Sequence, residues 1–332
     1  MSSENESPGV NPETIGAGLP NLARVIDERK ATSIRLVGTP LSEIDIRQPI
    51  EWVWKGVIPR NGALTIFDGM PDVGKSTLAL DIAARISTGR QMPDGSPSID
   101  GGVVIVTSES AQRIIARQVE LAGGDRSRIH LVSTVGEGLE ERPISLPSDL
   151  PLIRPVLKEV GAVALILDPL LEVFGGSRAK SDPYNDGDVR RGLTPVRRLC
   201  EDLNLALIGI RHPTKATSGT AMYRGGGSVA FVAVSRAAFF IAPDPTDSRI
   251  RVIANTKCNL GPKPESMAYR LDAVRDLKDV PGGDDDFGVC RIDWLGHIDR
   301  TAQELADSSE TLSPEQHGIL EALSNGCDSI AA

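Results

Sequence analysis

The feature that most constrains the fold of this chain is a glycine-containing loop at residues 69–76, with the sequence GMPDVGKS. The loop follows residues 62–68, GALTIFD, an apolar run that is typical of a buried strand. It precedes residues 77–90, whose pattern favours a helix. The motif GxxxxGK followed by Ser or Thr, between a strand and a helix, is typical of phosphate-binding loops, so it predicts an α/β fold.

The chemistry of such a loop comes from its backbone and from two side chains. Backbone N–H groups face phosphate oxygens, and the N-terminus of the following helix adds partial positive charge. Lys75 is expected to contact the β- and γ-phosphates and to act in catalysis, while the Ser76 hydroxyl binds Mg²⁺. We therefore predict that the chain binds and hydrolyses Mg·ATP. The predicted nucleotide-binding residues of the loop are Gly69, Met70, Pro71, Asp72, Val73, Gly74, Lys75, Ser76 and Thr77.

Asp72 is the unusual residue of this loop, because a small residue or glycine is common at its position. A carboxylate near phosphates is unfavourable unless it faces solvent. Asp tolerates a left-handed backbone better than most residues do, so the loop can still form. We expect Asp72 to weaken nucleotide affinity.

Strand and helix patterns alternate after the loop, which predicts βαβ units and a mostly parallel central sheet flanked by helices. The expected strands are residues 102–108, 129–133, 163–168 and 205–211, and the expected helices are 111–121, 149–160 and 188–203. After residue 225 a short helix is followed by successive strand patterns, which predict an antiparallel extension at the C-terminal side. These segments are the helix 228–236 and the strands 237–242, 249–254, 266–271 and 288–294.

Acidic residues follow two of the apolar strand patterns. Asp168 follows residues 163–167, VALIL, as expected for the aspartate that holds Mg²⁺ in P-loop proteins. The next residue is Pro169, so the catalytic base must come from elsewhere. Parallel strands place their carboxyl ends at one edge of the sheet, so Glu109, after the neighbouring strand, is expected to deprotonate the attacking water. The alternative for Glu109 is an acid that caps the following helix.

His212 follows the expected strand at residues 205–211, which ends at the same edge of the sheet. An imidazole at this position is suited to sense the γ-phosphate, so we count His212 among the predicted catalytic residues. The alternative is a structural histidine, which is the commoner role of a lone histidine.

Together these residues resemble one family, the RecA-like ATPases of the hexameric plasmid replicative helicase RepA type, within the AAA family and the RecA/DnaB-like superfamily. The resemblance covers residues 51–296 and is good in order and spacing. It rests on the lead-in WKGVIP at 54–59, Ser108 with Glu109, LDP at 167–169, RHP at 211–213, and YRGGGS at 223–228 leading to Arg236. It implies a RecA-like fold with a C-terminal antiparallel extension.

The resemblance also implies a homo-oligomer, in the form of a hexameric ring, with nucleotide bound between subunits. Arg236 matches the arginine finger, which acts on the neighbouring subunit and stabilises charge in the transition state. Lys257 lies where related ring ATPases carry another basic residue that contacts nucleotide in trans. Those proteins often have Lys-x-Arg there, whereas this chain has Asn259 two residues on. A surface salt bridge is the alternative role for both cations.

Two glycine-containing segments, residues 175–188 and 213–227, are candidates for contact with single-stranded DNA. Each carries two basic residues, but the first also carries three Asp, so its net charge is not basic. The leading hypothesis is an oligomeric, helicase-like motor in plasmid, phage or mobile-element replication. The alternative is an ATP-dependent switch or assembly module with slow hydrolysis and no translocation. A recombinase is less favoured, because no separate basic DNA-binding domain is visible.

Three regions are expected along the chain: a partly disordered N-terminal segment at 1–50, the ATPase domain at 51–298, and a tail at 299–332. The tail contains one short predicted helix at 317–323. This helix is either a packing appendage, which we slightly favour, or the start of a winged-helix-like module that has been cut short.

Composition and charge argue against several other classes of protein. The net charge of −9 argues against a protein that coats DNA by bulk electrostatics. The four cysteines form neither a CxxC pair nor a zinc-like set, so we expect reduced thiols. No apolar run approaches the roughly 18 residues of a membrane span, and the N-terminus lacks the apolar stretch of a signal peptide. We therefore expect a cytoplasmic protein that does not bind membranes.

Overall fold

The structure is a computed structural model that describes residues 40–43, 45–47, 49–108, 111–137, 140–175, 182, 184–211, 229–274 and 289–311. The chain divides into two units, Met1–Pro49 and Ile50–Ala332. Among its described residues the first unit contains a 3-10 helix, η3 (Leu41–Glu43). Every other element named below belongs to the second unit.

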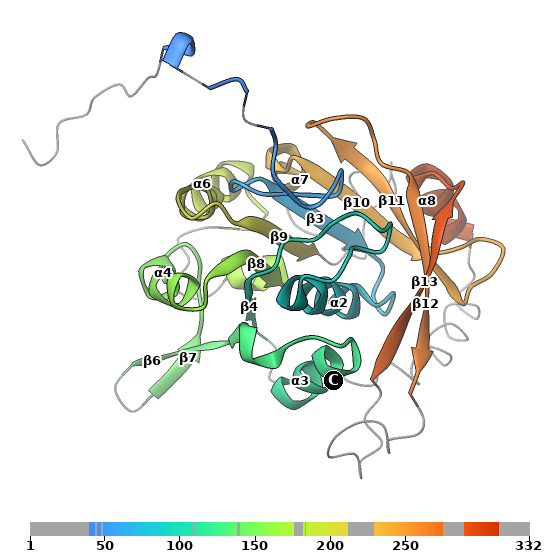
Figure 1. The fold of residues 1–332 in the computed structure, drawn as a ribbon, viewed down its shortest axis with the longest axis horizontal. Helices are drawn as coiled ribbons and strands as arrows, with labels where there is room; N and C mark the ends of the chain where they lie inside the picture. The colour runs from blue at the N-terminus through green and yellow to red at the C-terminus, as the bar shows by residue number, and fades with distance from the viewer. Residues whose placement is uncertain are drawn as a thin grey trace, which may run out of the picture. The chain divides into compact units, whose positions relative to one another are not determined.

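The centre of the second unit is a nine-stranded sheet in the order β13-β12-β11-β10-β3-β9-β8-β4-β5 (Figure 1). The strands from β10 to β5 in this order run parallel to one another. They are β10 (Ala237–Pro243), β3 (Leu64–Gly69), β9 (Ala206–Arg211), β8 (Ala162–Asp168), β4 (Gly102–Thr107) and β5 (Ile129–Val132). Antiparallel pairing extends the sheet through β11 (Ile250–Cys258), β12 (Ser266–Ala273) and β13 (Cys290–Ile298). The predicted parallel core with an antiparallel extension is confirmed.

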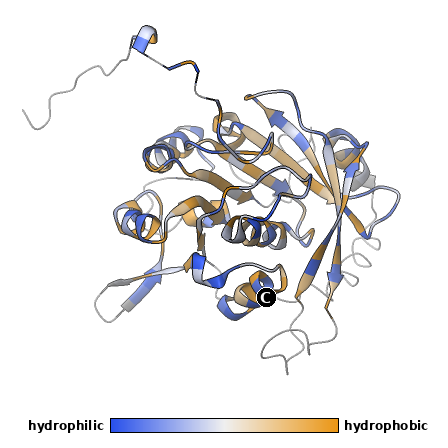
Figure 2. Ribbon diagram, in the orientation of Figure 1, coloured by the Kyte–Doolittle hydropathy of each residue, from blue (hydrophilic) through white to orange (hydrophobic). Residues whose placement is uncertain are grey.

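Helices cover both faces of the sheet, which explains why its central strands are mostly apolar, with their charged residues near the carboxyl ends (Figure 2). One face packs against α2 (Lys75–Thr88) and α3 (Gln112–Leu121). The other packs against α4 (Leu150–Glu159), α5 (Leu170–Gly175), α6 (Asp186–Asp202) and α7 (Ala230–Val234). These elements agree with the expected helices, except that α5 was not predicted.

Several short elements were missed by sequence reasoning. Two small hairpins lie outside the main sheet, β1 (Trp52–Trp54) with β2 (Ile58–Pro59) and β6 (Thr134–Glu137) with β7 (Glu140–Pro143). A 3-10 turn, η4 (Arg126–Arg128), precedes β5. All of these are too short to establish a strand or helix period on their own.

A further helix, α8 (Ala302–Thr311), lies in the tail at 299–332, for which only the helix at 317–323 was predicted. Leu305 of α8 is fully buried and packs, with two neighbouring alanines, against β10 and β11. Thr301 and Glu304 cap the helix reciprocally, the Thr301 N–H donating to the Glu304 carboxylate at 2.7 Å. The three-region division of the chain stays a prediction, and the predicted helix at 317–323 lies outside the described residues.

The described cysteines differ from one another. Cys200 and Cys258 are free thiols, and burial raises the pKa of Cys200 to about 12. Cys290 is disulfide-bonded, so the expectation of reduced thiols was wrong for this residue. Within the described part of the chain, none of the helices has the length and apolar character needed to span a bilayer.

Candidate functional site

The phosphate-binding motif forms the connection between β3, which ends at Gly69, and α2, which begins at Lys75. Gly74 is the N-cap of α2 and has a left-handed backbone, with φ 78°. Asp72 is also left-handed, with φ 62°, which confirms that this residue accepts the conformation expected of it. The loop therefore turns sharply enough to place the N-terminus of α2 directly after the sheet edge.

The Lys75 side chain is turned back into the loop. Its Nζ donates a hydrogen bond to the carbonyl oxygen of Met70 at 2.6 Å, and the residue is 3% exposed. Ser76 and Thr77 follow in the first helical turn and are half-buried. This arrangement gathers an ammonium group, a hydroxyl and the amide groups of a helix N-terminus at one place, which suits a phosphate group.

Asp168 reaches the same edge of the sheet from β8. It is the last residue of that strand, is buried, and pairs in register with Thr107 at the end of β4. The carboxyl ends of parallel strands meet at one edge, which is where ligands bind in open α/β sheets. A hydroxyl at Ser76 and a carboxylate at Asp168 are oxygen donors of the kind that Mg²⁺ prefers, so these residues fit a Mg·ATP site.

A buried ion pair lies directly below the loop and was not predicted. Arg211, which ends β9, donates from Nε to Asp68 Oδ1 at 2.5 Å and from Nη2 to Oδ2 at 2.7 Å. Asp68 precedes Gly69, and the two charged residues are opposite each other in the parallel pairing. A usable sequence signal was present, since one acid and one base each stand near the end of an otherwise apolar strand pattern.

A second carboxylate, Glu172 of α5, was also missed. The Ser108 hydroxyl, just beyond β4, donates to the Glu172 carboxylate, which joins the end of β4 to the first turn of α5. Glu172 is exposed and lies four residues after Asp168 in the sequence. Glu109 and His212 both lie outside the described residues, so their roles stay predictions.

Arg236 and Lys257 lie away from the loop. They are at the amino ends of the parallel strands, whereas the loop is at the carboxyl ends. The Arg236 N–H donates to the Leu64 carbonyl at 2.9 Å, and Leu64 begins β3, whereas the loop follows the other end of that strand. Lys257 pairs with Ala238, near the start of β10. The structure therefore does not bring these two cations to the phosphate-binding loop of their own chain.

The environments of these two cations differ. Arg236 is exposed, whereas Lys257 is half-buried and its Nζ donates to the Val232 and Ala233 carbonyls of α7 at 2.7 and 2.9 Å. Burial lowers the pKa of Lys257, and the charge of the nearby Arg236 lowers it further. Lys257 thus interacts favourably with the C-terminal end of a short helix.

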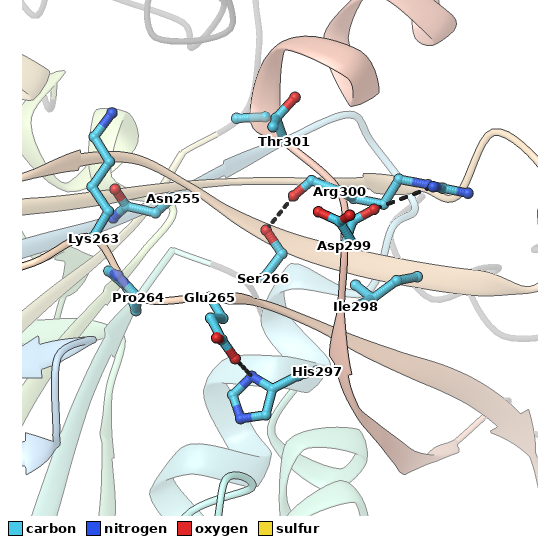
Figure 3. Close-up of a pocket in the computed structure, with 11 residues that line it drawn as sticks. Asn255, Lys263, Pro264, Glu265, Ser266, His297, Ile298, Asp299, Arg300 and Thr301 are labelled. Atoms are coloured by element: carbon cyan, nitrogen blue, oxygen red, sulfur yellow. Dashed lines mark hydrogen bonds and ion pairs between the residues drawn. The ribbon is translucent and has the colours of Figure 1, made fainter.

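A cavity of about 580 Å³ lies beside β11, where β12 begins and where the chain passes from β13 to α8 (Figure 3). Two pairs involve residues that line it: Glu265 lies 3.3 Å from His297, and Arg300 pairs with Asp244 at 2.8 Å. None of the residues of the 69–77 loop lines it. This cavity is separate from the candidate nucleotide site.

The two candidate DNA-contacting segments are mostly outside the described residues. Residues 213–227 lie wholly outside them, as do 176–181 and 183 of the first segment. In the described part of the first segment, the Asn185 side chain caps α6 by accepting from the Gly187 and Asp188 N–H groups. The role of both segments in DNA binding stays a prediction.

The parallel sheet, the loop after β3 and the acid at the end of β8 define the RecA-like class of P-loop proteins. Residues 39–218 match the family described as AAA domain. This match covers more than half of the chain, so the chain belongs to that family.

Curated relatives match a smaller part of the chain. A probable plasmid replicative DNA helicase of Chlamydia trachomatis serovar L2 is 27% identical over 168 residues, which are 46% of this chain and 36% of the relative. A second C. trachomatis protein of the same description matches to the same extent. The chain thus spans little more than a third of the length of these relatives.

Two solved structures are similar to this chain. One solved ATPase domain is 12% identical, has a TM-score of 0.50, and covers 77% of this chain and 95% of its own length. The RadB recombinase is 17% identical, with a TM-score of 0.41 over 64% of this chain and 88% of that one. At 12% identity, the similarity to the solved ATPase domain concerns the fold alone.

Proposed function

We propose that this chain is a RecA-like ATPase that binds and hydrolyses Mg·ATP and acts as an oligomeric, helicase-like motor on DNA in plasmid, phage or mobile-element replication. One observation carries the nucleotide part: the sharp loop between β3 and α2, with the Lys75 ammonium turned into it. The similarity to probable plasmid replicative DNA helicases supports the DNA part.

Each residue of the site has a distinct task in this proposal. The amide groups at the start of α2 and the Lys75 ammonium bind the phosphates, while Ser76 and Asp168 hold Mg²⁺. When bound there, Mg²⁺ would supply positive charge to neutralise the charge that develops on the phosphate oxygens. Glu109 takes the proton from the attacking water, and His212 senses the γ-phosphate.

The position of Arg236 supports an oligomer. This exposed side chain lies at the sheet edge opposite to the loop, so it is suited to act on the nucleotide of a neighbouring subunit. Lys257, close to Arg236, is proposed as a second contact of the same kind. A closed hexameric ring would give every subunit such a neighbour.

Asp72 favours one alternative function. The Asp72 carboxylate in the loop is expected to weaken the binding of phosphates and so to slow ATP turnover. Slow turnover suits a nucleotide-dependent switch or assembly module that does not translocate. The two functions differ in their response to DNA. A motor is stimulated by the strand that it moves along, whereas a switch of this kind hydrolyses ATP at a rate that is indifferent to DNA.

The test is the steady-state ATPase rate with and without single-stranded DNA. We expect wild-type turnover that single-stranded DNA stimulates, and a loss of about 100-fold or more in Lys75→Ala, because one preorganised positive group is removed from the transition state. Lys158→Ala, on the exposed side of α4, is the matched control and should hydrolyse ATP at the wild-type rate. Normal hydrolysis by Lys75→Ala would contradict the site, and slow turnover unaffected by DNA would favour the switch.

A further inference from the structure

The antiparallel strand β12 extends past the end of β3 and so reaches the phosphate-binding loop. Gly69, the last residue of β3, pairs with Ile241 of β10, and Ile241 pairs with Ile253 of β11. Ile253 in turn pairs with Met267 of β12. Since Met267 is level with Gly69, the residues that follow Met267 lie alongside the loop rather than alongside β3.

Two residues on one face of β12 contact two successive residues of the loop. The Tyr269 hydroxyl donates to the Val73 carbonyl oxygen at 3.0 Å. Leu271 is next on the same face, and a Cβ built on Gly74 would lie 2.6 Å from its Cδ1. A side chain at Gly74 would therefore require the end of the Leu271 side chain to shift, and it would be strained by the left-handed backbone at this position.

The Tyr269 contact determines how one peptide group of the loop is oriented. The Val73 carbonyl and the Gly74 N–H belong to the same peptide group, which is trans, so they point in opposite directions. Because Tyr269 holds the carbonyl towards β12, the Gly74 N–H is directed away from β12. In phosphate-binding loops, such N–H groups are the ones that bind phosphate oxygens.

We propose that Tyr269 is a positioning residue for nucleotide phosphates: its hydroxyl holds the Val73–Gly74 peptide so that the Gly74 N–H is presented to the phosphates of ATP or ADP. This role rests on the proposed function of the loop. Tyr269 itself does not touch the nucleotide and acts through the backbone of the loop.

Strand β13, which forms an antiparallel hairpin with β12, packs against Tyr269 and holds it in place. The Tyr269 side chain has no exposed surface, and its ring lies 5.3 Å from the ring of Trp294 on β13. The Trp294 indole N–H donates to Asp81 of α2 at 3.0 Å, which ties the same hairpin to the helix that follows the loop. The loop is thus oriented before nucleotide binds, and such preorganisation lowers the entropy that binding costs.

The test is Tyr269→Phe, which removes the hydroxyl and keeps the ring. The Kd for Mg·ADP, measured by titration calorimetry, and the KM for Mg·ATP are each expected to rise about fivefold, the value of one ordinary hydrogen bond. The kcat should stay within about twofold of wild type, because the N–H contact is made in the ground state and the transition state alike. A purely structural role would instead lower the fraction of active protein and leave Kd and KM unchanged.

Ser266→Ala is the matched control. Ser266 begins the same strand, and its hydroxyl also donates to a backbone carbonyl at 2.6 Å, but that carbonyl belongs to Arg300, which is not part of the loop. The control is expected to lose a similar amount of thermal stability and to bind Mg·ADP with wild-type Kd. If wild type binds nucleotide and Tyr269→Phe binds it equally well, or if Ser266→Ala weakens binding as much, the positioning role is overturned. A wild-type chain that binds neither nucleotide would contradict the proposed function itself.

Discussion

At the scale of single residues, Asp68 and Arg211 form a buried ion pair next to the candidate site. Both side chains are almost fully buried, at 4% and 1% exposure, and the pairing is bidentate. Removing one partner of such a pair leaves an uncompensated charge in the interior, which costs far more than the intact pair contributes. The pair joins the ends of β3 and β9 immediately before the loop and before His212.

We therefore expect Arg211→Met to lower the free energy of unfolding by about 3–5 kcal/mol, as measured by urea denaturation. The double variant Asp68→Leu with Arg211→Met removes both charges, so it should recover part of that loss. A single variant as stable as wild type, or a double variant whose losses simply add, would show that the buried charges are not coupled in this way.

At the scale of elements, α8 completes the core at the C-terminal side of the sheet. Leu305 and its two alanine neighbours cover apolar residues of β10 and β11 that otherwise face solvent. The turn before β11 is joined to the residue before Thr301 by the Asp244–Arg300 ion pair at 2.8 Å. The helix is therefore part of the folded unit that carries the nucleotide site, because β10 is the direct neighbour of β3.

Leu305→Ala should lower the free energy of unfolding by about 2–5 kcal/mol, the usual range for a buried leucine. Gln303→Ala, on the exposed side of the same helix, should change it by no more than about 0.5 kcal/mol. Chemical denaturation of both variants provides the comparison. Equal stabilities would mean that α8 does not pack on the sheet in solution.

At the scale of the whole molecule, the parallel sheet separates two groups that the proposed catalysis needs together. The loop follows the carboxyl end of β3, and Arg236 precedes β10 at the amino end. Because β3 and β10 are parallel neighbours, no movement of side chains alone can unite the loop and Arg236 within one chain. A head-to-tail arrangement of copies would bring the two edges together at each interface.

Mixing two inactive variants tests this arrangement. Glu109→Ala and Arg236→Ala oligomers are each expected to lack ATPase activity, since every interface carries a defect. In randomly mixed rings about a quarter of the interfaces combine an intact Glu109 with an intact Arg236. The ATPase rate should therefore return to about a quarter of the wild-type rate. Native mass spectrometry would verify that mixed rings have formed. Mixed rings without recovered activity would place Arg236 outside the catalytic site.

The amino-acid sequence by itself determined the features that depend on neighbouring residues. The motif at 69–76 predicted the turn between a strand and a helix, and Asp72 was correctly judged able to take a left-handed conformation. The alternation of strand and helix patterns predicted the parallel sheet and its antiparallel extension, because burial on one or both faces leaves a local period in the sequence. The roles of Glu109 and His212 stay predictions.

Only the tertiary structure decided which distant residues meet. Tyr269 and Val73 are 196 residues apart, and Arg211 and Asp68 are 143 apart, so no local pattern links either pair. The register between neighbouring strands places β12 beside the loop and Arg236 at the far edge of the sheet. Helix α8 was missed for the same reason: its three buried apolar residues form too weak a period alone and gain their stability from the sheet against which they pack.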